Sequence, residues 1–174
     1  MKRLLMASLG LVVLVGVSAP LSAQGHARGK AELTLQGKTV SIDYGRPALH
    51  GRQVNDMLAK LQPGQVWRLG ANESTTFSTD ADLSFGSVTV PAGVYSLWAR
   101  KESDKKWTLV FNKQHGQWGT EHDASLDLYS APLHEDRVMT SDDLVTIDLK
   151  KHGDGGQFSV QWGNLKLANN FTVK

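Results

Sequence analysis

The feature that most constrains this chain is the one-by-one alternation of apolar and polar residues along most of its length. Val40, Ile42 and Tyr44 alternate with polar residues. Further apolar triplets of this kind are Tyr95, Leu97 and Ala99; Trp107, Leu109 and Phe111; Val145, Ile147 and Leu149; and Phe158, Val160 and Trp162. Successive side chains of a strand point to opposite faces, so a period of two indicates strands with one buried face. We predict an all-β fold, an antiparallel, jelly-roll-like β-sandwich of roughly ten strands.

Turn residues divide these strands. Gln36-Gly37-Lys38 predicts a hairpin turn between the first two strands, and Pro91-Ala92-Gly93 predicts a second tight turn. Residues 83–90 are expected to form one strand that continues past Gly86. Pro132 is expected to break a strand, because proline has no N–H for the ladder. Residues 165–173 are expected to form a separate last strand.

One segment beyond the N-terminal region favours a short helical turn. Met57, Leu58 and Leu61 have helical spacing, and Pro63-Gly64 ends the pattern. Asn55 or Asp56 is a suitable N-cap residue for this turn.

The N-terminal residues have the pattern of a secretory signal peptide. Lys2 and Arg3 precede an apolar run, Leu4 to Val17, that is followed by small residues. Such a run is too short for a comfortable membrane span of about 20 residues. We predict a signal peptide over residues 1–23, a flexible linker over 24–30 and a single domain over 31–174, with cleavage after Ala27 and an uncleaved anchor as the alternatives. After cleavage no stable membrane anchor is expected.

Charge and cysteine content limit the partners and the compartment. Without Lys2 and Arg3, 17 basic residues remain against 17 acidic ones, so a mature chain is neutral and lacks the basic surface that binds nucleic acid. With no cysteine, disulfides, thiolate metal sites and lipid attachment are excluded. Together with the predicted signal peptide, this leads us to expect a periplasmic or secreted protein.

Charged and amide side chains gather where strands end, and they form the candidate site. Arg46 and Arg52 flank one loop, and Arg68, Asn72 and Glu73 lie around a bend between two strand segments. Guanidinium groups and an amide bind carboxylates, phosphates or sugar hydroxyls. The alternative, which the spacing favours, is an internal Arg68–Glu73 pair that holds the bend to the sheet. Both roles are compatible.

The longest stretch without periodicity, Lys113 to Asp123, is expected to be a functional or mobile loop. It adds Asn112, Lys113 and Trp118 to the candidate ligand-binding residues. His115, Glu121 and His122 do not have the spacing of a known zinc motif, so we predict neither a metal site nor a cofactor. Among the tryptophans, those in phase with their strands are predicted to be core, namely Trp67, Trp107 and Trp162. Trp98 and Trp118 are candidates for stacking on a ligand or for packing under the loop.

Several blocks together resemble a known family. They are Tyr44-Gly45-Arg46-Pro47 with Gly51-Arg52; Val66-Trp67-Arg68 with Gly70-Ala71-Asn72-Glu73; Pro91-Ala92-Gly93 with Tyr95; and Trp107 through Asn112-Lys113 to Trp118-Gly119. The chain is similar, from about Leu33 to Val173, to the bacterial domain-of-unknown-function family numbered 2911. The resemblance implies a secreted or periplasmic β-sandwich-like protein and supplies no catalytic residue.

We therefore predict a non-enzymatic binding module of the cell envelope for a small polar or glycan-like ligand. Its site joins the 46–52 loop, the 68–73 bend and the 113–123 loop. One alternative is a hydrolase of an envelope polymer, with Glu73 or His115 as acid or base. The other is a purely structural envelope protein.

Overall fold

The computed structural model describes residues 27–174. The predicted signal peptide and residues 24–26 of the predicted linker lie outside this range. The first strand begins at Arg28, so residues 28–30 of the predicted linker are paired in the sheet. Within residues 27–174 no helix has the length and apolar character needed to cross a membrane.

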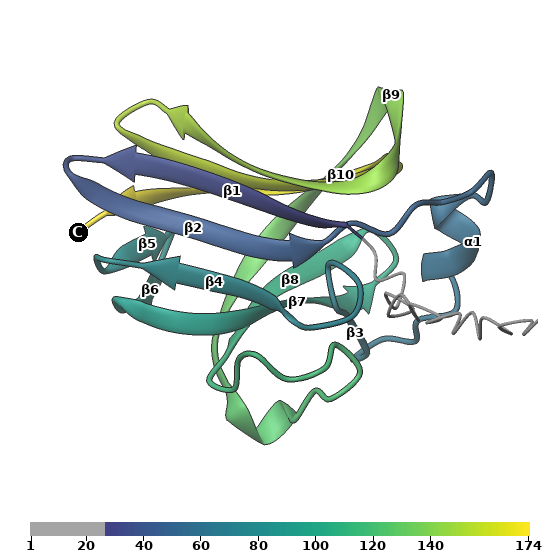
Figure 1. Ribbon diagram of the computed structural model, residues 1–174, viewed down its shortest axis with the longest axis horizontal. Coiled ribbons are helices and arrows are strands. Elements are labelled where there is room, and N and C mark those ends of the chain that lie inside the picture. The colour runs from purple at the N-terminus through teal and green to yellow at the C-terminus, as the bar shows by residue number, and fades with distance from the viewer. Residues whose placement is uncertain (1–26) are drawn as a thin grey trace, which may run out of the picture.

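The described residues form ten strands, one short α-helix and one 3-10 turn (Figure 1). In chain order they are β1 (Arg28–Leu35), β2 (Lys38–Gly45), α1 (Val54–Leu58), β3 (Val66–Trp67), β4 (Thr75–Thr79), β5 (Leu83–Phe85), β6 (Val88–Val90), β7 (Gly93–Ser103), β8 (Lys106–Asn112), η1 (Ala124–Leu126), β9 (Asp127–His152) and β10 (Gly155–Val173). The predicted all-β antiparallel sandwich is confirmed.

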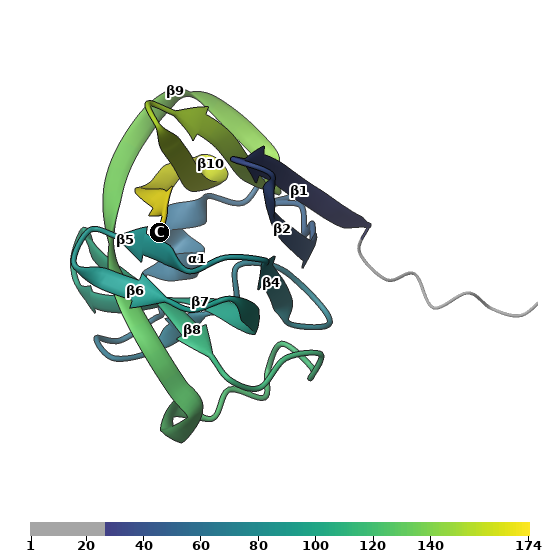
Figure 2. The ribbon, with the colours of Figure 1, turned by 90° about the vertical axis from the view of Figure 1, so that its left-hand side faces the viewer.

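The strands form one continuous antiparallel sheet, in the order β1-β2-β4-β7-β8-β9-β10-β5-β6, with β3 beside β7. Strand β9 pairs with β8 over residues 127–133 and with β10 from His134 onward. It therefore passes from one layer of the sandwich into the other, and Figure 2 shows it curving between them. The far end of β10 pairs with β5.

The β1–β2 hairpin forms as its sequence predicts. Gln36 and Gly37 have φ angles of 51° and 76° and connect Leu35 directly to Lys38. Two positive φ angles in a two-residue connection are typical of the turn that matches the twist of a hairpin. The alternating residues Val40, Ile42 and Tyr44 are all buried.

Three boundary predictions were wrong. Pro132 lies inside β9, opposite Thr108 of β8, and the ladder between β9 and β10 extends only to His134, so no β10 partner requires the missing N–H. Residues 155–173 form one strand that bends at irregularities around Gly163 rather than two strands. Residues 83–90 form two strands, because Gly86, with φ 64°, turns β6 back onto β5.

The helix is present, but its predicted cap was wrong. Gln53 occupies the N-cap position and makes no capping hydrogen bond. Asn55 instead accepts a hydrogen bond at Oδ1 from Arg137 Nη1 at 2.7 Å. The helix starts one residue before Asn55 because Val54 and Leu58 are both buried and pack toward β10.

Aromatic side chains fill the space between the layers at both ends. At the β5 end, the ring of Phe111 lies 5.4 Å from that of Phe77 and 5.3 Å from that of Phe85. At the end near α1, Trp67 of β3 stacks on Trp162 of β10, with ring centroids 5.7 Å apart and an interplanar angle of 12°. Each such pair contributes about 1 kcal/mol beyond its buried area.

The bend between β3 and β4 is fixed by a close approach of two backbones. A Cβ at Gly45, the last residue of β2, would lie 2.1 Å from the carbonyl oxygen of Ala71. Ala71 itself is 1% exposed. Only glycine at position 45 allows the bend to lie against the end of β2.

We therefore expect Gly45→Ala to destabilise the protein by about 3 kcal/mol, because the added methyl group forces two backbone segments apart. The matched control is Gly51→Ala, at a position with φ 77° and no atom within 4 Å of the added Cβ. The control should cost only the backbone strain, about 1–2 kcal/mol. Urea unfolding measures both, and equal losses would show that the 45–71 contact is not tight.

Candidate functional site

A cleft of about 570 Å³ opens at the end of the sandwich that carries α1. Its walls come from the 46–52 loop, α1 and the residues after it, β3 and the following bend, the 119–122 segment, and β7 and β10. The lining residues are Pro47, Ala48, Arg52, Met57, Leu58, Leu61, Val66, Trp67, Arg68, Gly70, Trp98, Gly119, Thr120, His122 and Trp162.

The cleft forms where the strand edge beside β7 is interrupted. Trp67 of β3 pairs with Ala99, and Thr75 of β4 pairs with Leu97. The whole segment 68–74 therefore bulges out opposite Trp98. Neighbouring residues of a strand face opposite sides of the sheet, so this interruption gives access to both faces of β7.

Three indole rings make the cleft apolar. Trp67, Trp98 and Trp162 are 7%, 2% and 4% exposed. Trp98 donates from Nε1 to Ser96 Oγ at 2.8 Å, and Trp162 donates from Nε1 to the Asp143 carbonyl at 3.2 Å. These partners satisfy the two polar groups that burial of Trp98 and Trp162 would otherwise leave unpaired.

Two arginines provide positive charge in this cleft. Arg52 donates from Nε to the Leu49 carbonyl at 2.7 Å and from Nη2 to the Ala48 carbonyl at 3.1 Å. Arg68 donates from Nε to the Gly70 carbonyl at 3.2 Å. Within residues 27–174, no carboxylate lines the cleft or lies within ion-pair distance of either guanidinium.

The bend that carries Arg68 is anchored on two sides. Leu69 and Asn72 have φ angles of 54° and 63°, and Thr75 Oγ1 donates to the Arg68 carbonyl at 3.2 Å. The Gly119 N–H donates to the Asn72 carbonyl at 2.7 Å. A second backbone contact, an antiparallel bridge, joins Glu73 to Trp118. The bend and the 113–123 loop are thus one connected wall.

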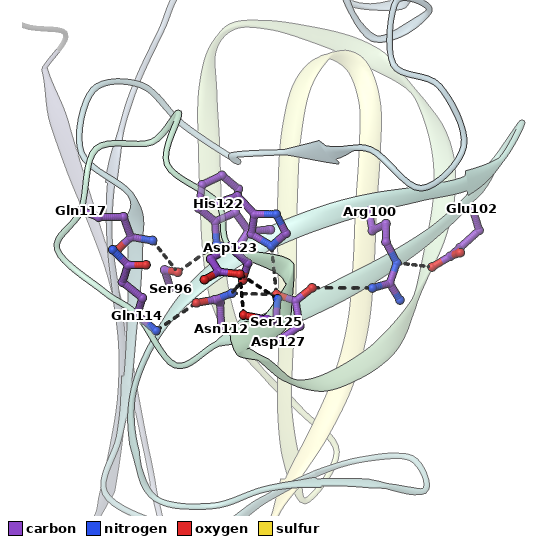
Figure 3. A network of polar contacts seen from close by, with 11 residues as sticks. Ser96, Arg100, Glu102, Asn112, Gln114, Gln117, His122, Asp123, Ser125 and Asp127 are labelled. Atoms are coloured by element: carbon purple, nitrogen blue, oxygen red, sulfur yellow. Dashed lines mark hydrogen bonds and ion pairs between the residues drawn. The ribbon is translucent and has the colours of Figure 1, made fainter.

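A polar network holds this loop against the outer face of β7 and β8 (Figure 3). At its centre Asn112, fully buried, donates from Nδ2 to the Asp123 carbonyl and to Asp127 Oδ1, both at 2.8 Å. Its Oδ1 accepts from the Gln114 N–H at 2.9 Å. The loop is irregular in conformation, but each polar atom of Asn112 has a partner.

Asp127 also binds the one histidine that lines the cleft. His122 Nε2 lies 2.9 Å from Asp127 Oδ1, and the imidazole packs on the Trp98 ring with centroids 4.7 Å apart. Arg100 Nη1 lies 3.8 Å from the other oxygen of Asp127. His122 is therefore held between an indole ring and a carboxylate.

Two carboxyl groups at the margin of the network have lowered pKa values. Hydrogen bonds from the Ser125 hydroxyl and N–H, at 2.6 and 2.9 Å, hold the pKa of Asp123 below its ordinary value. The hydrogen bond from Arg100 does the same for the pKa of Glu102. Both groups are charged at neutral pH, and Asp123 caps η1.

The family model described as "Protein of unknown function (DUF2911)" matches residues 27–171. The chain belongs to this family. Comparisons with curated proteins and with solved structures gave no significant match. All cleft-lining residues lie inside the DUF2911 match, so the cleft is part of the family domain.

Two of the predicted site residues line the cleft of this DUF2911 protein, and the others lie outside its lining. Arg52 and Arg68 both line the cleft, whereas Asn72, Asn112, Lys113 and Trp118 do not. Arg46 points to β9, where it donates to the Val145 carbonyl and to Thr146 Oγ1, each at 3.1 Å. Lys113 is exposed, and Trp118 is 49% exposed beside the bend.

The predicted Arg68–Glu73 pair is absent from the described residues. Glu73 lies 3.6 Å from Arg28 of β1, an arginine that also pairs with Asp43. The bend turns Glu73 outward, and its side chain is 62% exposed. The guanidinium of Arg68 consequently keeps its Nη atoms available at the cleft.

Of the three indoles that line the cleft, sequence reasoning named only Trp98 as a candidate for stacking on a ligand. Trp67 and Trp162 were interpreted only as core residues, although their strand phase, beside a charged bend, also suits the floor of a cleft. His122 was considered only as a metal ligand. Within residues 27–174, no group of three or more His, Asp or Glu residues is placed to hold a metal ion.

Asn112→Ala should lower the free energy of unfolding by about 3 kcal/mol, because it removes three hydrogen bonds and leaves buried partners unpaired. Hydrogen exchange of the backbone over residues 113–126 should also become faster. The control is Gln114→Ala, which removes an exposed side chain on the same loop. It should change the free energy of unfolding by no more than about 0.5 kcal/mol. A stable Asn112→Ala protein with unchanged exchange would show that the loop is held by other contacts.

Proposed function

We propose that this DUF2911 protein binds a small organic anion in the tryptophan cleft. The observation that carries the proposal is the state of Arg52 and Arg68. Both use Nε to bind a backbone carbonyl, and no carboxylate lines the cleft beside them within the described chain. Guanidinium groups fixed in this way are pre-organised to bind an oxyanion through their remaining N–H groups.

The rest of the cleft suits an apolar body attached to that anion. Its volume, about 570 Å³, falls in the range of small-molecule sites. Met57, Leu58 and Leu61 form one side, and the indoles form the floor. A sugar ring would need an exposed indole face, whereas these three indoles are nearly buried, so an aromatic or aliphatic carboxylate fits better than a glycan.

The two alternatives have less support. Glu73 and His115, the residues assigned to a hydrolase of envelope polymers, lie outside the cleft lining. Glu73 is exposed and near Arg28. A purely structural role gives no reason for two arginines without a carboxylate partner to line an apolar cleft.

We further propose that the protein acts after export, in the periplasm or outside the cell. The support is the basic start and apolar run of residues 1–23, together with a complete lack of cysteine. An apolar cleft with positive charge would then take up its ligand from the compartment outside the inner membrane.

Calorimetric titration with benzoate tests the binding proposal, because benzoate combines a carboxylate with a flat apolar body. We expect saturable binding that weakens about tenfold or more in Arg68→Gln and in Arg52→Gln, as the loss of a charged hydrogen bond requires. Higher salt should weaken the binding as well.

Arg137→Gln is the matched control, since Arg137 is a half-exposed arginine outside the cleft that binds Glu135. It should leave benzoate affinity unchanged. The proposal fails if benzoate and related carboxylates do not bind, or if the Arg137 variant loses as much affinity as the Arg68 variant.

A further inference from the structure

His122 and Asp127 have the arrangement of a base and the residue that orients it. The side chains of His122 and Asp127 are 15% and 12% exposed, and Nε2 lies 2.9 Å from Asp127 Oδ1. Asn112 donates to the same carboxylate oxygen at 2.8 Å. The Trp98 ring packs against the imidazole from one side, with an interplanar angle of 49°. A histidine held in this way cannot rotate freely.

The bond to Asp127 determines which ring nitrogen is the base. A carboxylate accepts hydrogen bonds, so Nε2 donates to Asp127, and in the neutral form of the ring the lone pair is on Nδ1. Figure 3 shows the imidazole above Asp127 with its second nitrogen turned away from that carboxylate. Among the described residues, Nδ1 has no hydrogen-bond partner, and His122 is part of the cleft lining.

Arg68 borders the same space. A Cβ at Gly119 would lie 2.9 Å from Arg68 Cδ and 3.6 Å from Arg68 Nη1, so the 119–122 segment runs directly along this side chain. The cleft thus combines a histidine base, an arginine beside the segment that carries it, and a second arginine, Arg52, in the 46–52 loop.

We propose that the protein hydrolyses a carboxylic ester in this cleft, and that the apolar body of the ester also carries an anionic group. This proposal rests on the proposed function, because the anion site holds the substrate. Arg52 binds the anionic group and Arg68 faces the ester carbonyl oxygen. His122 Nδ1 takes a proton from a water molecule while the water oxygen bonds to the carbonyl carbon. Negative charge develops on the carbonyl oxygen, where Arg68 stabilises it.

Collapse of this intermediate completes the reaction. The bond between the carbonyl carbon and the alcohol oxygen breaks, and His122 returns its proton to the departing alkoxide. One ester and one water give one carboxylic acid and one alcohol. His122 is the catalytic residue, and Asp127 is a positioning residue that keeps the proton on Nε2. Esters suit this set of groups because an alkoxide leaves more readily than the amide anion that an amide substrate would have to release.

Water rather than a side chain is the nucleophile in this scheme. Thr120 lines the cleft, but no hydrogen bond joins its hydroxyl to His122 among the described contacts.

The test uses 4-carboxyphenyl acetate, whose hydrolysis releases 4-hydroxybenzoate and acetate. The wild-type protein should hydrolyse it with saturation, and His122→Ala should lower kcat by about 100-fold or more with little change in KM. Added imidazole should restore part of the turnover to His122→Ala, because it can occupy the vacated space as the base. A histidine that only holds the loop would not be rescued in this way.

His115→Gln is the control, since His115 is an exposed histidine of the same loop that does not line the cleft. It should keep wild-type turnover. The proposal that His122 and Asp127 act in ester hydrolysis is overturned if the wild type binds benzoate but does not hydrolyse the ester, or if His122→Ala remains active. It is also overturned if His122→Ala is inactive yet folded and imidazole restores nothing. If benzoate does not bind at all, the anion site itself is wrong and both proposals fall.

Discussion

The contact on which the cleft depends is the stack of Trp67 on Trp162. Trp67 belongs to a two-residue strand beside β7, and Trp162 belongs to β10, which lies after β9 has crossed to the other layer. Their rings, 5.7 Å apart and nearly parallel, connect the two layers at the end of the sandwich that carries α1. The Phe111 cluster fills the space between the layers at the other end. Between a wide aromatic floor and an interrupted strand edge, a cleft remains.

The second requirement of the cleft is the polar network on the other side of β7. Asn112 and Asp127 use their buried polar atoms to hold an irregular loop, and this converts the loop into a wall of the cleft. A buried network of this kind is stable only when each member is paired. The same network places His122 between Asp127 and the cleft. The contacts that hold the loop in place therefore also position the His122 side chain at the cleft.

Period-two patterns predicted the strands well because each strand in this fold buries at least one face. Beyond hairpins such as β1–β2, they could not predict which strands lie side by side, since β5 and β6 leave the order β4-β7 and join β10. Pro132 was expected to break a strand, but a missing N–H disrupts a sheet only where a neighbouring strand would accept a hydrogen bond from it. Glu73 was assigned to Arg68 from spacing alone, whereas the positive φ angle of Asn72 belongs to a bend that turns Glu73 toward Arg28. The role of Trp98, out of phase yet 2% exposed, depends on a loop whose path no local pattern encodes.

The central claim, that ligands enter between the tryptophan floor and the two arginines, is tested most directly by the indole N–H signals of the five tryptophans in a nitrogen-edited NMR titration with benzoate. The account predicts that the signals of Trp67, Trp98 and Trp162 shift in a saturable manner. Trp107, whose Nε1 donates to Glu135 away from the cleft, and the outlying Trp118 should stay in place. Shifts confined to Trp107 or Trp118, with the three cleft indoles unchanged at saturation, would contradict it.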